Sequence, residues 1–178
     1  MSGVRAVFLD RDGTLMEEVD YCRDPARVRV YPGVPEALRK IKAAGWRTFI
    51  VTNQSGIGRG MFTVAQFNAV EQEALRQIGP GQVDASYFCA DLPSAPTQRR
   101  KPAPGMILEA AAAFGIDLAA SFMVGDKASD IECGRRAGTR TILVRTGYGA
   151  ATERDPGFQA PDFVANDVPE AVRWILKQ

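Results

Sequence analysis

The chain is predicted to be an α/β protein, a doubly wound three-layer sandwich around a mainly parallel sheet. Short apolar runs alternate with amphipathic helical patterns along its 178 residues, and three of the runs end in polar side chains. Such strand–helix alternation is typical of parallel sheets with helices on both faces. The length suits one domain with a substantial core, so residues 1–178 are expected to form a single domain.

The first half of the chain has three apolar runs of strand length. They cover residues 4–9, 46–52 and 85–90. Between them, Pro32 and Gly33 open an amphipathic helix that stops at Gly45, and Thr63 can cap a second helix that runs to about Ile78. The side chains expected to face inward are Val34, Ala37, Leu38 and Ile41 in the first helix, and Val64, Phe67, Val70, Ala74 and Ile78 in the second.

The second half repeats the alternation. Pro104 starts an alanine-rich helix that ends near Gly115. Two further helices and three strands are expected after it. The helices are 129–137 and 169–177, and the strands are 121–125, 139–144 and a short edge strand at 160–165.

Two aspartates, Asp10 and Asp12, lie where the first predicted strand ends, and Gly13 then breaks the strand. The carboxyl edge of an open α/β sheet is where ligands bind. Two crowded carboxylates repel each other unless a cation joins them or one is protonated, and Mg²⁺ prefers such oxygen ligands. An isolated Asp-x-Asp-Gly would more simply be an ordinary turn with solvated carboxylates.

Three later features follow in order: Thr52 and Asn53 at the end of an apolar run, Lys101 before a proline, and Gly125-Asp126 with Asp130 four residues beyond. Each has an ordinary reading, as a strand-end turn, a solvated lysine and a helix cap. Together with the aspartate pair they form a four-part pattern that resembles the haloacid dehalogenase superfamily of phosphatases. The resemblance implies a Rossmann-like fold with strand order 5-4-1-2-3 and Mg²⁺-dependent hydrolysis of phosphomonoesters.

The resemblance also assigns catalytic roles. Asp10 would attack phosphorus and form an aspartyl phosphate, and Asp12 would protonate the leaving oxygen and later activate water. Thr52 and Lys101 would bind the phosphoryl oxygens that are not transferred.

The metal site follows from the same resemblance. Mg²⁺ would be held by a carboxylate oxygen of Asp10, the backbone carbonyl of Asp12 and the carboxylate of Asp126. Asp130 is expected to stand behind the metal or to orient Lys127.

Longer stretches resemble the D-glycero-D-manno-heptose 1,7-bisphosphate 7-phosphatase family. They are residues 8–15 with Tyr21, 51–60, 100–102, 123–127 and 143–147. The resemblance implies release of the 7-phosphate to give heptose 1-phosphate for nucleotide-activated heptose and lipopolysaccharide. The residues that would contact this sugar phosphate are Glu18, Asp20, Tyr21, Asn53, Gln54, Ser55, Arg100 and Lys127. A solvated acidic loop remains the alternative for Glu18 and Asp20.

The spacing leaves no room for an inserted cap domain, because about forty residues separate Asp12 from Thr52. Substrate selection is therefore expected from the loops at 16–31, 54–61 and 90–100.

The chain departs from the family in the loop before Lys101. The family usually holds a structural zinc there, through a Cys-x-His pair and a Cys-x-Cys pair. Here the two pairs read Cys89-Ala90-Asp91 and Thr97-Gln98-Arg99, so a tetrahedral Cys/His site is not available. No structural zinc is expected. Cys89 is expected to be a buried strand-end residue, and the loop to be held by its shortness and its prolines.

Composition narrows the function further. The chain has no histidine, which excludes Ser-His-Asp, Cys-His and histidine-based zinc hydrolysis. A net charge of +1 favours neither nucleic acid nor an anionic membrane. With three widely spaced cysteines, no membrane span and no signal peptide, a cytoplasmic location is expected, and a monomer is the default.

Alternative functions remain open at this point. Histidinol-phosphate phosphatases share the scaffold and much of the pattern, and an aminoalcohol substrate would need an acidic pocket. A nucleic-acid end-processing phosphatase is less favoured, because the chain lacks a basic stripe with interleaved aromatics. A catalytically inactive interaction module is least favoured, since every carboxylate that the mechanism needs is present.

Overall fold

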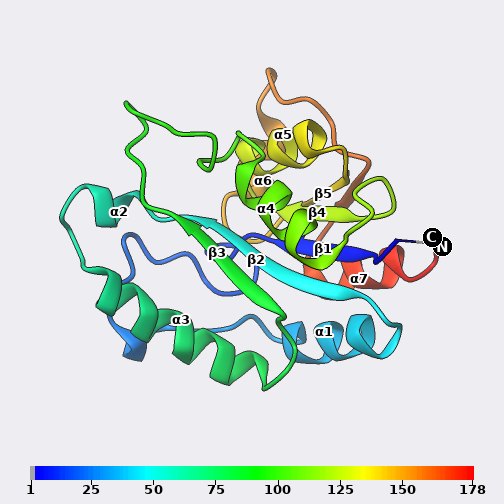
Figure 1. Cartoon of the computed structure of the whole chain (residues 1–178), viewed down its shortest axis with the longest axis horizontal. Coiled ribbons are helices and arrows are strands. Elements are labelled where there is room, and N and C mark those ends of the chain that lie inside the picture. Colours follow the sequence, from blue (N-terminus) through cyan, green and yellow to red (C-terminus); the bar gives the residue numbers. More distant parts are fainter. Residues whose placement is uncertain (1–2) are drawn as a thin grey trace.

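In the computed structural model, which describes residues 3–178, six strands form one sheet in which all paired strands are parallel. The strands are β1 (Ala6–Leu9), β2 (Arg47–Asn53), β3 (Ala85–Cys89), β4 (Phe122–Gly125), β5 (Arg140–Val144) and β6 (Phe163–Ala165). Their order is β3-β2-β1-β4-β5-β6 (Figure 1). The expected order of the first five strands is confirmed, and the short strand near residue 165 adds at the β5 edge.

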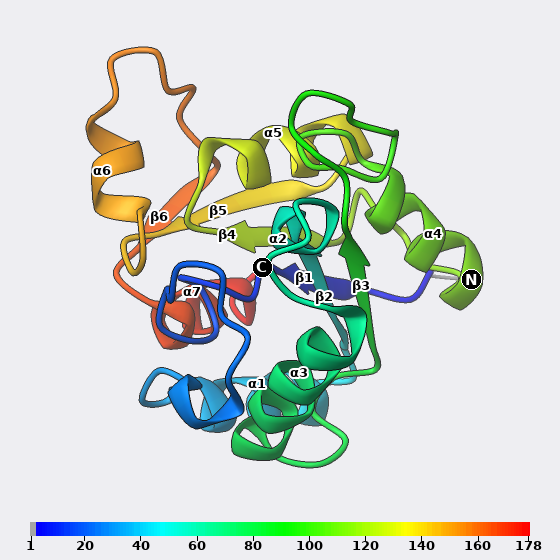
Figure 2. The same ribbon diagram turned by 90° about the vertical axis from the view of Figure 1, so that its left-hand side faces the viewer.

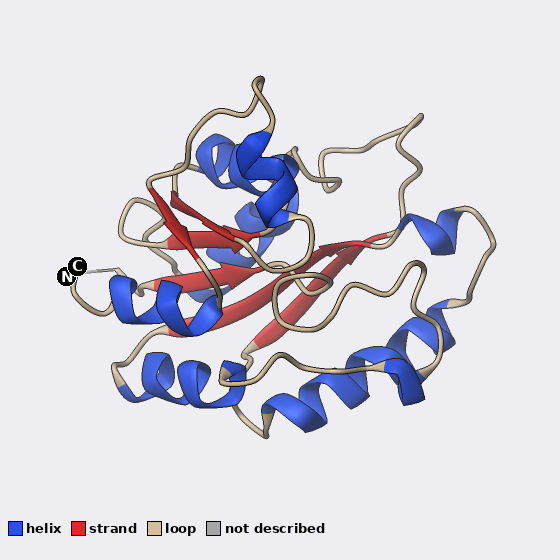
Figure 3. Cartoon of the chain, turned by 180° about the vertical axis from the view of Figure 1, so that it is seen from behind, coloured by secondary structure: helices blue, strands red, loops and turns tan. Residues whose placement is uncertain are grey.

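Helices cover both faces of this sheet (Figure 3). The helices are α1 (Val34–Ala43), α2 (Ser55–Gly58), α3 (Val64–Ile78), α4 (Gly105–Phe114), α5 (Ala128–Ala137), α6 (Gly149–Arg154) and α7 (Val168–Ile175). Helices α1, α3 and α7 lie on one side, and α4 and α5 lie on the other (Figure 1). This is the predicted doubly wound α/β architecture. None of the helices described within residues 3–178 is long and apolar enough to cross a membrane.

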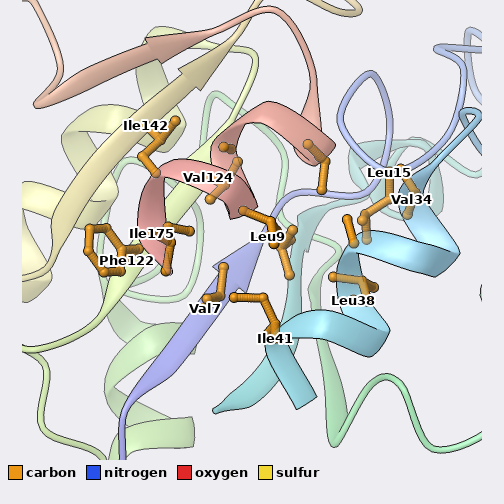
Figure 4. Packing of buried hydrophobic residues seen from close by; sticks show 14 of the residues in the cluster. Val7, Leu9, Leu15, Val34, Leu38, Ile41, Phe122, Val124, Ile142 and Ile175 are labelled. Atoms are coloured by element: carbon orange, nitrogen blue, oxygen red, sulfur yellow. The ribbon is translucent and has the colours of Figure 1, made fainter. Parts of the chain in front are cut away.

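The core has two halves because side chains of a strand point alternately to opposite faces. Val7 and Leu9 of β1 pack toward α1 and α7, where they meet Leu38, Ile41 and Ile175 (Figure 4). Ala6 and Phe8 of the same strand face α4 and α5. Both faces of β1 are fully buried, which explains its continuous apolar run.

Helix α3 begins at the predicted cap. The Thr63 hydroxyl accepts from the Gln66 N–H at 3.2 Å, and the Gln66 side chain accepts from the Thr63 N–H at 2.9 Å. The expectation that Val64 faces inward is wrong, since this side chain is 45% exposed. The inward stripe starts one turn later, where the Phe67 ring lies tilted against Phe88, with 4.5 Å between ring centres, and Val70 joins the core.

After the carboxyl ends of β1, β2 and β3, the chain follows longer segments with little regular structure (Figure 2). Residues 16–31 are irregular apart from a 3₁₀ turn at Pro25–Arg27, as expected. Their apolar side chains pack on α3; these are Met16, Cys22 and Val28 against Val70 and Ala74. The segment 54–61 was expected to be a loop, but it contains the single helical turn α2. These segments surround the edge of the sheet at which the polar residues gather.

Candidate active site

Neighbouring strand ends bring the predicted catalytic residues together. Asp10 directly follows β1, Thr52 lies near the end of β2, and Asp126 directly follows β4. Because β2, β1 and β4 are adjacent in the sheet, their ends meet at one point. The carboxylates of Asp10, Asp126 and Asp130 each offer an oxygen within 4.8 Å of the others, and all three are buried.

Lys101 is a buried cation in this cluster. Its Nζ lies 2.8 Å from Asp10 Oδ1 and 2.7 Å from Asp130 Oδ1, and it donates to the Val51 carbonyl at 2.8 Å. Burial alone would lower the pKa of Lys101, but the charges of Asp10 and Asp130 outweigh it and raise the pKa. Lys101 therefore stays charged and orients the Asp10 carboxylate.

Asp130 joins two lysines of the site. Its carboxylate pairs with Lys101 rather than with the Lys127 side chain, and it touches Lys127 by accepting from that residue's backbone N–H at 3.0 Å. Asp130 is the third residue of α5, so its side chain turns back toward the start of the helix. It orients Lys127 through the main chain.

Asp126 is held on both oxygens. Oδ2 accepts from the Tyr148 N–H at 2.8 Å, and Oδ1 accepts weakly from the Thr14 hydroxyl at 3.4 Å. Gly13 packs directly against it with a φ of +82°, and a Cβ there would lie 2.3 Å from Asp126 Oδ2. Glycine is required at position 13 on both counts.

The electrostatics of this cluster suit a divalent cation. Burial, followed by the charges of Asp10 and Asp130, raises the pKa of Asp126 to about 8. Three buried carboxylates face the ammonium of Lys101 and, at the edge of the cluster, that of Lys127, so carboxylates outnumber ammonium groups. Hard carboxylate oxygens are the ligands that Mg²⁺ prefers, and these residues fit such an ion.

Asp12 is fixed by two neighbours. The Gln54 amide donates to Asp12 Oδ2 and to Thr52 Oγ1, both at 2.8 Å. The guanidinium of Arg11 contacts both carboxylate oxygens of Asp12, with Nη2 3.0 Å from Oδ2. Gln54 therefore holds together two residues that the sequence predicts to be catalytic. The role of Arg11 was missed by the sequence reasoning, although an arginine at the end of an apolar strand is an unusual residue for that position.

Two adjoining cavities lie over these groups. The smaller has a volume of about 40 Å³ and is lined by Asp10, Asp12, Thr52, Asn53, Lys101, Lys127, Ser129 and Asp130. The larger has a volume of about 180 Å³ and is lined by Asp12, Glu18, Val19, Asp20, Tyr21, Cys22, Asn53, Gln54, Ser55, Gly56, Lys127 and Tyr148. We call them the inner and the outer cavity. They share Asp12, Asn53 and Lys127, so they form one continuous site.

Most of the residues expected to contact substrate line the outer cavity. Arg100 differs, because it belongs to neither lining and its guanidinium donates to the Asp91 carbonyl at 2.8 Å. The loops 16–31 and 54–61 supply lining residues as expected. The loop 90–100 supplies none to these two cavities.

One cation and one aromatic ring stand at the edge of the outer cavity. Lys127 Nζ lies 3.2 Å from Glu18 and 4.9 Å from the centre of the Tyr148 ring. Burial raises the pKa of Glu18 although the charge of Lys127 opposes the shift. Tyr148 is half-exposed and was missed by the sequence reasoning, because it lies 21 residues beyond Lys127 on another loop.

The loop before Lys101 is held by hydrogen bonds to Asp91. Its carboxylate accepts from the Thr97 N–H at 2.7 Å and from the Thr97 hydroxyl at 2.6 Å. Asn53 anchors the end of the loop, since its amide exchanges two 3.0 Å hydrogen bonds with the backbone of Lys101. Cys89 is buried as expected. That the loop holds no structural zinc stays a prediction.

The site can be compared with known proteins. A family model described as HAD-hydrolase-like matches residues 98–171. A D-glycero-D-manno-heptose-1,7-bisphosphate 7-phosphatase of Thermosynechococcus vestitus is 40% identical, over 96% of this chain and 94% of its own length. A D-glycero-beta-D-manno-heptose-1,7-bisphosphate 7-phosphatase of Yersinia pestis is 39% identical, over 98% of both chains.

A solved structure agrees with these relatives. The D,D-heptose 1,7-bisphosphate phosphatase of B. bronchiseptica, complexed with magnesium and phosphate, superposes with a TM-score of 0.90 at 31% identity, covering 98% of this chain and 99% of that one. Similarity of this extent over nearly the whole length covers every strand that positions the site. The chain is therefore a phosphatase that belongs to the haloacid dehalogenase-like heptose-1,7-bisphosphate 7-phosphatase family.

Proposed function

We propose that this phosphatase removes the 7-phosphate of D-glycero-D-manno-heptose 1,7-bisphosphate in the presence of Mg²⁺. The product would be heptose 1-phosphate, a precursor of nucleotide-activated heptose. The observation that carries the proposal is the 40% identity to a heptose bisphosphate phosphatase over nearly the full length of both chains. The continuous inner and outer cavities, with reacting groups in one and polar groups in the other, support it.

Asp10 is the nucleophile in this proposal. One of its oxygens is 2.8 Å from Lys101 Nζ, which leaves the other free to attack phosphorus. The bond to the sugar oxygen breaks, and Asp12 gives that oxygen its proton. Water then attacks the aspartyl phosphate while Asp12 takes the proton back, and inorganic phosphate leaves. Gln54 holds Asp12 at the right place for both steps.

The phosphoryl oxygens that are not transferred need positive charge and hydrogen-bond donors. Lys101 and the Thr52 hydroxyl line the inner cavity and supply them. Mg²⁺, held by Asp10, the Asp12 carbonyl and Asp126, would neutralise further charge on the phosphoryl group. Asn53 acts through the Lys101 backbone, which its amide holds in place.

The sugar would occupy the outer cavity. Lys127 is the cation of its lining, and Glu18, Asp20 and Ser55 offer hydrogen bonds to hydroxyl groups. Tyr21 lines the outer cavity. Its backbone is left-handed, with a φ of 47°, which is unusual for a residue other than glycine. Arg100 stays a proposed contact for the sugar or its distal phosphate, which would have to extend beyond the two cavities to reach it.

Histidinol phosphate is the second candidate substrate. The lining of the outer cavity carries three carboxylates, Asp12, Glu18 and Asp20, against the one ammonium of Lys127. An acidic lining suits an aminoalcohol better than it suits a second phosphate. Histidinol phosphate is therefore included among the substrates to be compared.

Phosphate release with Mg²⁺ tests the proposal. The substrates are both anomers of heptose 1,7-bisphosphate, histidinol phosphate and fructose 1,6-bisphosphate. We expect kcat/KM for one heptose anomer to exceed the others by about 100-fold, equivalent to about 2.7 kcal/mol of transition-state discrimination. A preference for histidinol phosphate would overturn the substrate assignment. Equal, slow turnover of all of them would show that the site selects another phosphomonoester.

We further propose that the protein works as a monomer in the cytoplasm. Cys22, Cys89 and Cys133 are all buried free thiols, as suits a reducing compartment. Sedimentation of the purified protein with and without Mg²⁺ tests the monomer, and a mass near 19.3 kDa is expected.

A further inference from the structure

Arg11 lies between the two aspartates in sequence and is 1% exposed, which makes it the largest of the fully buried side chains. It belongs to neither cavity lining. Its guanidinium contacts Asp12 through Nε and Nη2, at 3.0 to 3.2 Å. A buried arginine next to a catalytic carboxylate needs a function, because burying a guanidinium is unfavourable unless it is fully paired.

The other side of the Arg11 guanidinium is held by helix α3. Nη1 donates to Glu71 Oε2 at 3.1 Å, and the guanidinium carbon lies 5.1 Å from the centre of the Phe67 ring. Both partners are buried, and they come from a helix sixty residues further along the chain. Burial alone would lower the pKa of Arg11, but the charges of Asp12 and Glu71 outweigh it and raise the pKa.

This arrangement restricts Asp12 more than one hydrogen bond would. A two-pronged guanidinium contact defines the plane of a carboxylate as well as its position. Gln54 approaches the same carboxylate at 2.8 Å from the end of β2. Glu71 and Phe67 prevent the guanidinium from turning, so the direction of Asp12 depends on helix α3.

We propose that Arg11 and Glu71 are positioning residues that aim the Asp12 carboxylate at the leaving oxygen. Helix α3 thus contributes to catalysis although none of its residues lines either cavity. The inference rests on Asp12 as the acid of the proposed mechanism. It does not depend on which sugar is the substrate.

The identity of the leaving group separates positioning from a structural role. A sugar alkoxide needs a proton as it leaves, whereas p-nitrophenolate leaves without one. A misaimed Asp12 should therefore slow formation of the aspartyl phosphate only for the first kind of substrate. Because kcat/KM reports this step and not the later attack by water, which both substrates share, kcat/KM is the quantity to compare. The experiment compares the best of the sugar phosphates tested above with p-nitrophenyl phosphate, for the wild type and for the variants Arg11→Met, Arg11→Lys and Glu71→Gln.

We expect Arg11→Met to lower kcat/KM for the sugar phosphate by about 100-fold and for p-nitrophenyl phosphate by about threefold or less. Arg11→Lys keeps the charge but loses the two-pronged contact, so its loss on the sugar phosphate should be about tenfold. For Glu71→Gln, kcat/KM on the sugar phosphate should lie between the values of the wild type and of Arg11→Lys. Each loss should appear in kcat rather than in KM.

Removal of Arg11 leaves the buried Glu71 and the part-buried Asp12 without their cation, so folding needs a control. The double variant Arg11→Met with Glu71→Met removes the buried unpaired charge of Glu71, while Asp12 keeps its hydrogen bond from Gln54, and should restore most of the melting temperature without restoring sugar phosphate turnover. Arg76→Met is the matched control, since it breaks an exposed ion pair with Glu73 on the same helix. It should leave both activities unchanged.

Equal losses on both substrates, or full sugar phosphate turnover by the folded double variant, would overturn the proposal. Failure of the wild type to hydrolyse heptose bisphosphate would instead overturn only the substrate assignment. The leaving-group comparison would still apply to whichever sugar phosphate it hydrolyses best.

Discussion

The inner and the outer cavity are built from different kinds of contact. Around the inner cavity, Asp10, Lys101 and Asp130 are each at most 4% exposed and are joined by ion pairs of 2.7 and 2.8 Å. At the outer cavity, Lys127 is partly exposed, its ion pair with Glu18 is 3.2 Å long, and Tyr148 is half-exposed.

This difference suggests that the groups proposed for the reaction and those proposed for substrate choice are held in place in different ways. Asp10 directly follows β1, and Lys101 is bound to Asp10, to Asp130 and to the Val51 carbonyl of β2, so the sheet and its ion pairs define the inner positions. The outer groups come mostly from irregular segments between strands and helices, and such loops change more freely. Reaction chemistry should therefore be sensitive to inner substitutions, and substrate preference to outer ones.

The largest effect should come from the proposed nucleophile, Asp10. Asp10→Asn should lower kcat by about 10⁴-fold or more, because an amide does not attack phosphorus. Stopped assays with Mg²⁺ would measure it. Asp155→Asn, an exposed turn residue, is the matched control and should be fully active. Full turnover by the Asp10 variant would contradict the covalent mechanism.

Two lysines allow a direct comparison between the cavities. Lys101→Met should lower kcat by about 10³-fold and the free energy of unfolding by about 3–5 kcal/mol, since it leaves Asp10 and Asp130 unpaired in the interior. Lys127→Met should raise KM by about tenfold with kcat within about twofold and almost no change in stability.

Denaturant unfolding and steady-state kinetics on the same preparations would test this contrast. A large loss of stability in the Lys127 variant would remove the distinction between the two cavities. So would a KM effect without a kcat effect in the Lys101 variant.

A smaller effect is expected on stability when Asp126, a proposed metal ligand, is replaced. In EDTA, Asp126→Asn should raise the free energy of unfolding by about 1–2 kcal/mol at pH 8, because it relieves repulsion among three buried carboxylates. The raised pKa of Asp126 means that the folded protein holds a proton there that the unfolded chain has lost. Wild-type stability should fall as the pH rises from about 4 toward 8.

Thermal melts at pH 5 and pH 8 would measure this. The variant should show a smaller pH dependence and should lose the stabilisation that Mg²⁺ gives the wild type. An Mg²⁺-induced shift of wild-type size in the variant would show that the ion binds elsewhere.

The smallest effect should come from Tyr148. Its ring faces the Lys127 ammonium, and a contact of this kind contributes about 0.5–1 kcal/mol at an exposed site. Tyr148→Ala should therefore raise KM by about three- to fivefold and leave kcat unchanged, whereas Tyr148→Phe should behave as the wild type. A kcat effect would place Tyr148 among the catalytic groups.

Local patterns were sufficient to predict the sheet and the inner residues. β1, β2 and β4 are buried on both faces, so each appears in the sequence as an apolar run, and Asp10 and Asp126 are the residues that follow two of them. Val64 shows the limit of periodicity. It has the right spacing for the inward stripe, but the first turn of α3 has little to pack against.

Contacts between distant segments were beyond prediction. Glu71 reaches Arg11 across 60 residues, and Glu18 reaches Lys127 across 109. Such pairs depend on how the helices and loops pack, and nothing in the local pattern of a helix tells which of its acidic residues is buried. Asp91 shows the same limit at short range, because its bond to Thr97 depends on the path of one irregular loop.

The central position of β1 also has a consequence for synthesis on the ribosome. The Ala6 N–H donates to Ser121 Oγ, 115 residues downstream, and Val7 aligns with Phe122 in the neighbouring strand. The strand that leads into Asp10, the proposed nucleophile, is therefore made long before its partner β4 leaves the exit tunnel. Until β4 is available, the four apolar residues of β1 lack this partner strand. During this interval the nascent chain is most exposed to chaperones and to aggregation.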